Sequence, residues 1–232
     1  MKMKITQNPS PNRSIGRQGH IPDFIVCHIT EGAFNGTIAW LTNPAAQVSY
    51  HFVVARDGRV SQAVDIENMA WANGTTNGNC NRDNRHSEIA AIRERRVNAN
   101  LYSVSIGFEG IHAQTQGVLT EAQISAGAEL MRYIRDEIKR RYGFQIPLAR
   151  TNIIGHNEVT PRTRPHCPGE RFPFDEFVRR TNASQMQASA WAQEAWDWAI
   201  RESITDGTRP RDNITREEAV TMLHRHYRNT AR

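Results

Sequence analysis

Residues 155–169, GHNEVTPRTRPHCPG, constrain the fold of this chain more than any other stretch. The apolar run at residues 152–155 predicts a buried strand that ends at His156. A polar loop interrupted by prolines then leads to Cys167, which a Pro-Gly pair follows at once. Zn²⁺ prefers imidazole and thiolate, so a histidine at a strand end and a thiol one loop later form a candidate pair of metal ligands.

A third ligand is needed, because a catalytic zinc ion takes three protein ligands and keeps one position open for water. The best candidate is His28 in FIVCHIT, a short β-branched run that predicts another strand. Side chains alternate along a strand, so Cys27 points away from whatever His28 binds. The residues therefore suggest the ligand set His28, His156 and Cys167. The alternative is two ordinary histidines and a buried free cysteine.

Residues 101–110 predict a strand with two different faces. One face is apolar, and the other is small and polar, carrying Ser103, Ser105, Gly107 and Glu109. A single carboxylate beyond two serines and a glycine indicates that Glu109 faces an open space rather than a core. The alternative is a surface carboxylate on a strand.

An Asp-Gly pair at residues 57–58 lies between two alternating runs and predicts a β-hairpin of residues 48–55 and 59–64. In the first strand, Tyr50 shares a face with Phe52, and the pattern alone is compatible with a half-buried aromatic whose hydroxyl reaches the surface. His51 lies on the opposite face, where we expect a core histidine with its hydrogen bonds satisfied.

Four blocks, VCHITEG, VSYHFVVARDGRVSQAVD, SVSIGFEG and GHNEV…CPG, resemble in this order those of the zinc-dependent N-acetylmuramoyl-L-alanine amidases of the amidase-2 type. That group includes bacteriophage endolysins and is related to the peptidoglycan recognition proteins. The resemblance covers about residues 22–180 and is greatest to endolysins of phages that infect clostridia and related Gram-positive bacteria. Four blocks in the correct order are far more specific than any one of them.

The resemblance implies an α/β fold with a mixed central β-sheet flanked by helices. It implies hydrolysis of the amide bond between N-acetylmuramic acid and L-alanine in peptidoglycan, which lyses the Gram-positive cell wall. It also implies Zn²⁺ as the cofactor, held by His28, His156 and Cys167. Glu109 then falls at the general base and Tyr50 at a catalytic tyrosine that stabilises the oxyanion together with the metal.

Two blocks depart from the family pattern. Some relatives carry a lysine two residues before the last ligand, where this chain has Pro165. The neighbouring Arg164 or His166 is then expected to contact the substrate and its oxyanion, with no preference between them. His166 also rivals Cys167 as a ligand, although the CPG block favours the thiol. The block AWANG resembles AWHAG, but Asn73 departs from its histidine pattern, so the block receives no substrate role.

Two other functions remain open. The first is a non-catalytic peptidoglycan-binding protein of the same fold, because some recognition proteins have lost the thiol ligand. The presence of Cys167 together with both histidines and Glu109 argues for catalysis instead. The second is a zinc peptidase that cuts within the stem peptide, which only the family resemblance disfavours.

The chain of 232 residues has a formal net charge of +5 and a pI near 9.4, which favours anionic partners. It has no helix-turn-helix pattern and no zinc-finger spacing, so we expect no nucleic acid. Anionic cell-wall polymers fit better, beside the peptidoglycan substrate. The alternative is an ordinary solvated basic surface.

Cysteine usage and the N-terminal sequence indicate where the chain is made. Its three cysteines, Cys27, Cys80 and Cys167, do not form a disulfide framework. MKMKITQNPSPNRS has no apolar core of a secretory signal, and no run reaches membrane-spanning length. We therefore expect synthesis in a host cytoplasm without a signal peptide, and action on the wall after release.

The pattern divides the chain into a zinc amidase catalytic domain, residues 1–182, and a helical module, residues 183–232. The first domain is expected to begin with an extended arm, residues 1–20, and to contain a long capped helix at residues 120–142. The second contains a helix, an Asp-Gly turn and a capped helix. Its sequence resembles a surface-layer-homology motif, a cell-wall attachment module. The alternative is an appendage that packs on the first domain or mediates a homodimer.

Overall fold

The computed structural model describes residues 3–74, 83–183, 188–205 and 214–230. The chain separates into two compact units, Met1–Thr181 and Asn182–Arg232. Cys80 and the expected Asp206-Gly207 turn lie outside the described residues. Among the described helices, none is both long enough and apolar enough to cross a membrane.

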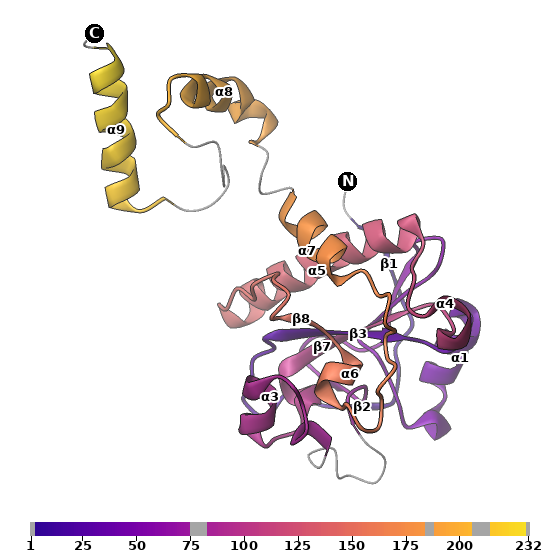
Figure 1. Ribbon diagram of the computed structural model, residues 1–232. Coiled ribbons are helices and arrows are strands. Elements are labelled where there is room, and N and C mark those ends of the chain that lie inside the picture. The colour runs from indigo at the N-terminus through magenta and orange to yellow at the C-terminus, as the bar shows by residue number, and fades with distance from the viewer. Residues whose placement is uncertain (1–2, 75–82, 184–187, 206–213, 231–232) are drawn as a thin grey trace. The chain divides into compact units, whose positions relative to one another are not determined.

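The first unit is built on a six-stranded mixed sheet, which confirms the expected fold class (Figure 1). Its strands lie in the order β1 (Ile5–Gln7), β5 (Val60–Gln62), β4 (Phe52–Val54), β7 (Ser103–Phe108), β3 (Phe24–Ile29) and β8 (Ile153–Gly155). The β4–β5 pair is antiparallel and the other neighbours are parallel. A separate antiparallel ribbon joins β2 (Arg13–Ser14) and β6 (Met69–Ala70).

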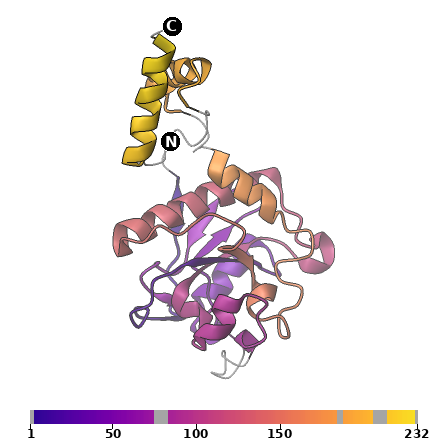
Figure 2. The same cartoon turned by 60° about the vertical axis from the view of Figure 1, so that its left-hand side comes forward.

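Helices cover both faces of this sheet, as Figures 1 and 2 show. One face carries α5 (Glu121–Tyr142) and α7 (Phe174–Ala183), whose buried apolar side chains form the larger core cluster. The opposite face carries α3 (Ala90–Arg95) and α6 (His156–Val159) over a smaller cluster. The remaining helices of the unit are α1 (Phe34–Thr42) and α4 (His112–Thr115), with short 3₁₀ turns at Pro44–Ala46 and Ala99–Tyr102.

The long helix α5 follows its sequence signals closely. Thr120 and Gln123 form the expected capping box, and Gly143 ends the helix in the left-handed conformation at φ 71°. The predicted stripe of Leu130, Ile134 and Ile138 is fully buried against the sheet. This helix therefore fixes the face of the sheet that lies away from the site.

The expected extended arm at residues 1–20 is wrong. Residues 5–7 pair with β5, residues 13–14 pair with β6, and the side chain of Arg17 is buried. The Arg17 guanidinium donates to the carbonyls of Ile66, Asn100, Leu101 and Ser103. These bonds give the buried guanidinium the hydrogen-bond acceptors that it needs in the interior. The composition of the segment did not indicate that Arg17 would be buried.

The predicted hairpin forms with shorter strands. Its turn contains Gly58 at φ 87°, and Ala55 N–H donates to the Arg59 carbonyl at 2.8 Å. Strand β4 begins only at Phe52, and the preceding His51 still bonds to both neighbours: its amide donates to the Ser105 carbonyl and its carbonyl accepts from the Ala63 amide. Tyr50 therefore precedes the strand instead of lying within it.

The second unit contains a 3₁₀ turn at Ala190–Ala192, α8 (Gln193–Arg201) and α9 (Arg216–Thr230). Thr215 and Glu218 form the expected capping box at the start of α9. The two helices contact each other through the rings of Trp198 and His226, whose centroids lie 5.5 Å apart.

Candidate metal centre and active site

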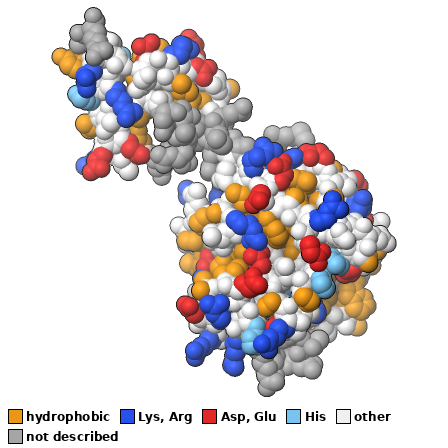
Figure 3. All heavy atoms as spheres, in the orientation of Figure 1, with side chains coloured by type: hydrophobic (Ala, Val, Ile, Leu, Met, Phe, Trp, Pro, Cys, Tyr) orange, Lys and Arg blue, Asp and Glu red, His pale blue; other side chains and the backbone are white. Residues whose placement is uncertain are grey.

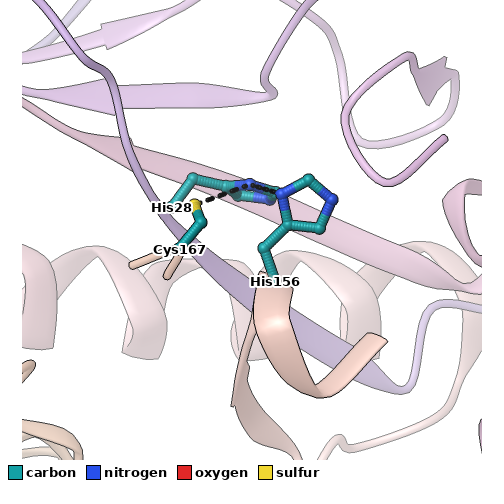
Figure 4. A group of neighbouring side chains, drawn as sticks. All are labelled: His28, His156 and Cys167. Carbon is teal, nitrogen blue, oxygen red and sulfur yellow. Dashed lines mark hydrogen bonds between the residues drawn. The ribbon is translucent and has the colours of Figure 1, made fainter. Parts of the chain in front are cut away.

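Three predicted ligands meet at one end of the sheet. His28 lies near the end of β3, His156 begins α6 directly after β8, and Cys167 lies in the following loop (Figure 4). The Nδ1 atoms of His28 and His156 are 3.0 Å apart, and Cys167 Sγ is 3.9 Å from His28 Nδ1. Both histidines are buried and the thiol is half-buried.

The parallel pairing of β3 with β8 explains why the two histidines meet. Cys27 is in register with Gly155, so the next residue of each strand emerges at the same edge. The loop returns because the Asn157 amide donates to the Cys167 carbonyl at 2.7 Å. A Cβ at Gly155 would lie 2.9 Å from Pro168 Cδ, so the close return of the loop requires glycine there.

The site keeps both imidazoles neutral. Burial is the main cause that lowers the pKa of His28 well below its usual value, and it lowers that of His156 to about 3. Burial also raises the pKa of the Cys167 thiol to about 12. The nitrogens thus have free lone pairs at neutral pH, whereas the thiol keeps its proton until a cation displaces it.

This donor set fits a zinc ion. Adjacent ligands in a tetrahedral zinc site lie about 3.3 Å apart for two nitrogens and about 3.6 Å for nitrogen and sulfur. The observed nitrogen–nitrogen distance of 3.0 Å and nitrogen–sulfur distance of 3.9 Å each lie about 0.3 Å from the corresponding value. In addition, the Nε2 atoms of His28 and His156 are buried without a geometrically ideal hydrogen-bond partner in the described part of the chain. When each Nδ1 lone pair faces a metal, each Nε2 carries a hydrogen that needs an acceptor.

Asn73 lies beside His28 and is oriented to serve as its acceptor. The Ser103 hydroxyl donates its single hydrogen to the Ala99 carbonyl at 2.8 Å, so it accepts from Asn73 Nδ2, also at 2.8 Å. This orientation leaves Asn73 Oδ1 as the acceptor, and the Asn73 side chain does interact with the His28 ring. The residue that looked like a departure from the family pattern therefore orients a candidate ligand.

Asp83 is placed to do the same for His156. Its Oδ2 accepts from the backbone amide of Thr163 at 2.9 Å and from the Thr163 hydroxyl. Its buried Oδ1 has no such partner among the described residues, and its charge acts on the pKa of His156 after burial and Arg164. A carboxylate behind a metal-ligating imidazole strengthens the ligand and fixes its tautomer.

Tyr50 lies against the predicted ligands. Its ring centroid is 4.9 Å from that of His28, and the absence of a side chain at Gly107 makes room for it. Burial raises the pKa of the Tyr50 hydroxyl, so it keeps its proton and can donate a hydrogen bond. This position is compatible with the expected role beside an oxyanion.

The Glu109 carboxylate makes structural hydrogen bonds in addition to its expected catalytic role. Its Oε1 accepts from the Phe34 amide at 2.9 Å, and its Oε2 accepts from the Arg56 amide at 2.7 Å. The carboxylate thus ties the end of β7 to the start of α1 and to the hairpin turn. It is absent from the described residues that line the adjoining pocket, and its role as a base stays a prediction.

The small polar face of β7 is buried and does not look across an open space. Ser103 and Ser105 are each 1% exposed. His51, as expected, is a core histidine: its Nδ1 accepts from the Ser105 amide at 3.0 Å, and its Nε2 contacts Arg17 and the Asn68 carbonyl. The face accommodates polar groups that support the site.

A pocket of about 1010 Å³ adjoins two of the three candidate ligands. His156 and Cys167 line it, as do Tyr50, Arg164 and His166. Behind burial, the charge of Arg164 acts on the pKa of both His156 and Cys167. His166 is exposed and its Nδ1 contacts Glu170 at 3.0 Å, so it faces a different partner from the one expected of a rival ligand.

Sequence reasoning missed four residues near the site: Asn73, Asp83, Glu31 and His112. Glu31 lines the pocket, and its charge acts on the pKa of Cys167 after burial and the Ile29 amide. Its place three residues beyond His28 was a usable signal. His112 follows the SIGFEG block closely, but nothing in its spacing connected it to the loop of Cys167.

Comparison with known proteins shows the family of this chain. The family model described as N-acetylmuramoyl-L-alanine amidase matches residues 18–170. N-acetylmuramoyl-L-alanine amidase A of Achromobacter lyticus is 24% identical over 186 residues, which are 75% of this chain and 92% of that protein.

Solved structures share the fold at low identity. PlyL is 18% identical with a TM-score of 0.52, covering 78% of this chain and 97% of its own. The amidase LysC from Clostridium intestinale is 19% identical with a TM-score of 0.50, covering 78% and 99%. At these identities the likeness concerns the fold alone.

Proposed function

Because this chain belongs to the N-acetylmuramoyl-L-alanine amidase family and so hydrolyses an amide bond of peptidoglycan, we propose that it depends on zinc and cuts between N-acetylmuramic acid and L-alanine. The observation that carries the zinc dependence is the convergence of two neutral imidazoles and a thiol beside a large pocket. The ligands would be His28, His156 and Cys167.

The metal and the protein have separate tasks. A bound zinc ion would supply Lewis-acid chemistry, which acidifies water and polarises a carbonyl group. Asn73 and Asp83 are placed to orient His28 and His156, and each would favour the tautomer whose Nδ1 lone pair faces a metal. This preorganisation limits the rearrangement that is needed when substrate arrives.

Three further residues handle protons and charge. We assign proton transfer from water to the leaving amine to Glu109. The protonated Tyr50 hydroxyl donates to the oxyanion that forms on the attacked carbonyl. Arg164, exposed on the pocket wall, meets the negative charge of the substrate, and His166 stands beside it as the other candidate contact.

The test combines metal analysis with product analysis on purified protein. Wild type should contain one tightly held zinc per chain, and digestion of Gram-positive walls should release new L-alanine amino termini. Cys167→Ser should lose both properties. Cys27→Ala is the matched control. Cys27 is a free thiol that directly precedes His28 in β3, but its side chain belongs to the core cluster on the other face of the sheet.

Each other outcome points to a defined alternative. Zinc binding without wall digestion would support the non-catalytic peptidoglycan-binding protein. New amino termini of residues beyond L-alanine would support a peptidase of the stem. Retention of zinc and lysis in Cys167→Ser would overturn the proposed ligand set.

We propose that the second unit attaches the enzyme to the wall, as its surface-layer-homology-like pattern suggests. Its described residues expose large apolar side chains, including Trp191 of the 3₁₀ turn at 90% and Tyr227 of α9 at 70%. The double variant Trp191→Ser, Tyr227→Ser should sediment less with purified walls but digest soluble muropeptides normally. If wall binding is unchanged while the sedimentation coefficient of the free protein falls, the unit forms a homodimer instead.

We also infer that the enzyme acts as an endolysin on a clostridium-like wall, which rests on the sequence resemblance. The net charge of +5 supports contact with anionic wall polymers. Lysis assays on walls of clostridia, bacilli and staphylococci, repeated after removal of teichoic acids, test both points. Equal lysis of all three walls would remove the host preference, and lysis that is unchanged after teichoic acid removal would remove the polymer contact.

A further inference from the structure

A second group of metal-ligating side chains lies at the rim of the pocket, apart from the three predicted ligands. It consists of His112 at the start of α4, and of His166 and Glu170 in the loop that carries Cys167. His112 Nε2 lies 2.9 Å from Glu170 Oε2, and His166 Nδ1 lies 3.0 Å from Glu170 Oε1. The two imidazole rings stack with centroids 5.2 Å apart.

The backbone holds these three side chains in place. The segment after α4 packs tightly on the Cys-Pro-Gly turn: a Cβ at Gly117 would lie 2.8 Å from the Pro168 carbonyl oxygen. The Arg171 amide also donates to the Gln116 carbonyl at 2.9 Å. At the other end, the carboxylate of Glu31 accepts from the His112 amide. The two segments therefore form one preorganised surface.

We propose that His112, His166 and Glu170 form a second binding site for a divalent transition-metal ion such as Zn²⁺. Two imidazoles and one carboxylate are a donor set that such ions accept, and neighbouring ligand atoms in a tetrahedral site lie about 3.3 Å apart. With one donor atom taken from each residue, all three atoms lie within 4.8 Å of one another, so side-chain rotations would bring them to that spacing. In the metal-free chain, His112 Nε2 and His166 Nδ1 donate their hydrogens to the Glu170 carboxylate, so each ring would move its hydrogen to its other nitrogen when an ion binds.

This second site is more exposed than the first, so its ion exchanges more readily. The side chains of His166 and Glu170 are 67% and 57% exposed, and that of His112 is 27% exposed. On the face drawn in Figure 3, surface histidines lie beside acidic side chains. Since His112 and His166 both line the pocket, an ion there would add positive charge and open coordination positions to the pocket wall.

The coordination chemistry of the second ion also indicates which substrate group would fill its open positions. A hard or borderline cation with water in its outer positions exchanges that water for carboxylate oxygen. The substrate class of the family carries carboxylates on its stem peptide, so the second ion would contact the peptide side of the substrate. This last step rests on the proposed amidase function, whereas metal binding at the cluster does not.

The experiment is equilibrium dialysis of the full chain against Zn²⁺, with zinc per chain measured by elemental analysis. Wild type should bind a first equivalent tightly and a second at least tenfold more weakly. His112→Gln and Glu170→Gln should each lose the second equivalent and keep the first. His86→Gln is the matched control, because His86 is an exposed histidine away from the cluster, and it should bind both.

Cys167→Ser in the same series separates the two proposals, because it should lose the first equivalent and keep the second. A wild type that binds one zinc in total, or a second equivalent that persists in both His112→Gln and Glu170→Gln, would overturn the second site. Retention of the first equivalent in those variants also shows that they remain folded.

Discussion

Asn73 donates through Nδ2 to the Ser103 hydroxyl at 2.8 Å, and its side chain interacts with the ring of His28. The Ser103 hydroxyl donates its one hydrogen to the Ala99 carbonyl, so it can only accept a hydrogen bond from Asn73. The Asn73 amide group therefore cannot flip to present its oxygen to Ser103. We infer that Asn73 favours the tautomer of His28 in which Nδ1 carries the lone pair. A metal-ligating histidine depends on such a partner for orientation and basicity.

Asn73→Ala should therefore weaken zinc binding by about 10- to 100-fold, because second partners of ligating histidines contribute this much. Competition against a zinc-chelating dye measures the affinity directly. The control is Asn12→Ala, which removes another buried asparagine whose side chain donates to the Leu41 and Asn43 carbonyls. Both variants should lose stability, but Asn12→Ala should keep wild-type zinc affinity. Equal zinc affinity in Asn73→Ala and wild type would contradict the assignment.

Tyr50→Phe should bind zinc normally but turn over about 10²- to 10³-fold more slowly, which is the usual effect of removing one oxyanion donor. The phenylalanine ring still fills the space between His28 and Gly107. Initial rates on a soluble muropeptide at saturating substrate measure the loss. The Tyr102→Phe variant removes another buried hydroxyl, one that has no geometric hydrogen-bond partner among the described residues, and it should retain activity. A Tyr50→Phe rate within threefold of wild type would exclude the donor role.

Glu109→Gln should keep zinc and lose about 10²- to 10⁴-fold in turnover, as expected for a general base. It should also lower the melting temperature, because one of the amides of Phe34 and Arg56 then faces an N–H₂ group instead of an oxygen. The two effects are measured separately, by kinetics well below the melting temperature and by thermal unfolding.

Glu31→Gln is the comparison for that variant, because Glu31 is the carboxylate that lines the pocket. It should retain most of the activity if Glu109 is the base. A large rate loss in Glu31→Gln, together with near-normal turnover in Glu109→Gln, would move the base to Glu31 and leave Glu109 as the group that ties β7 to α1.

The sequence was sufficient where the signal was local or periodic. The capping box at Thr120, the alternation that turns Cys27 away from His28, and the Asp57-Gly58 hairpin all appear in the structure. His28 and His156 lie at the carboxyl ends of two predicted strands. These strands, β3 and β8, are parallel neighbours, so their carboxyl ends and the loop of Cys167 meet at the same edge of the sheet.

What the sequence could not predict depends on contacts between distant segments. Arg17 is buried because carbonyls from residues 66 and 100–103 surround it, and no local pattern records that. Likewise, Asn73 is oriented towards His28 only because its side chain donates to Ser103, which is 30 residues away in the sequence. His112 and Glu170 meet because two turns pack backbone to backbone, which depends on Gly117 and Gly169.

The last prediction concerns acid stability and Glu137 on α5. Its carboxylate accepts from Arg140 at 2.7 Å and from Arg141 at 2.9 Å, and its side chain is 18% exposed. The bond from Arg140 is the main cause that lowers the pKa of Glu137 to about 2 in the folded protein. The unfolded value is about 4.3, so between these two values the unfolded state binds more protons.

The stabilisation from Glu137 should therefore be complete above about pH 5.5, roughly one unit above the unfolded pKa, and disappear as the pH falls towards 2. Glu137→Gln should cost roughly 1 kcal/mol in the free energy of unfolding at pH 7, since partly exposed pairs contribute little. Urea unfolding at pH 7, 4 and 2.5 should show the gap to wild type shrinking in that order. Asp136→Asn, whose carboxylate is 65% exposed beside Arg135, should change the free energy less at every pH. A gap that stays constant down to pH 2.5 would mean that packing, and not charge, is what Glu137 contributes.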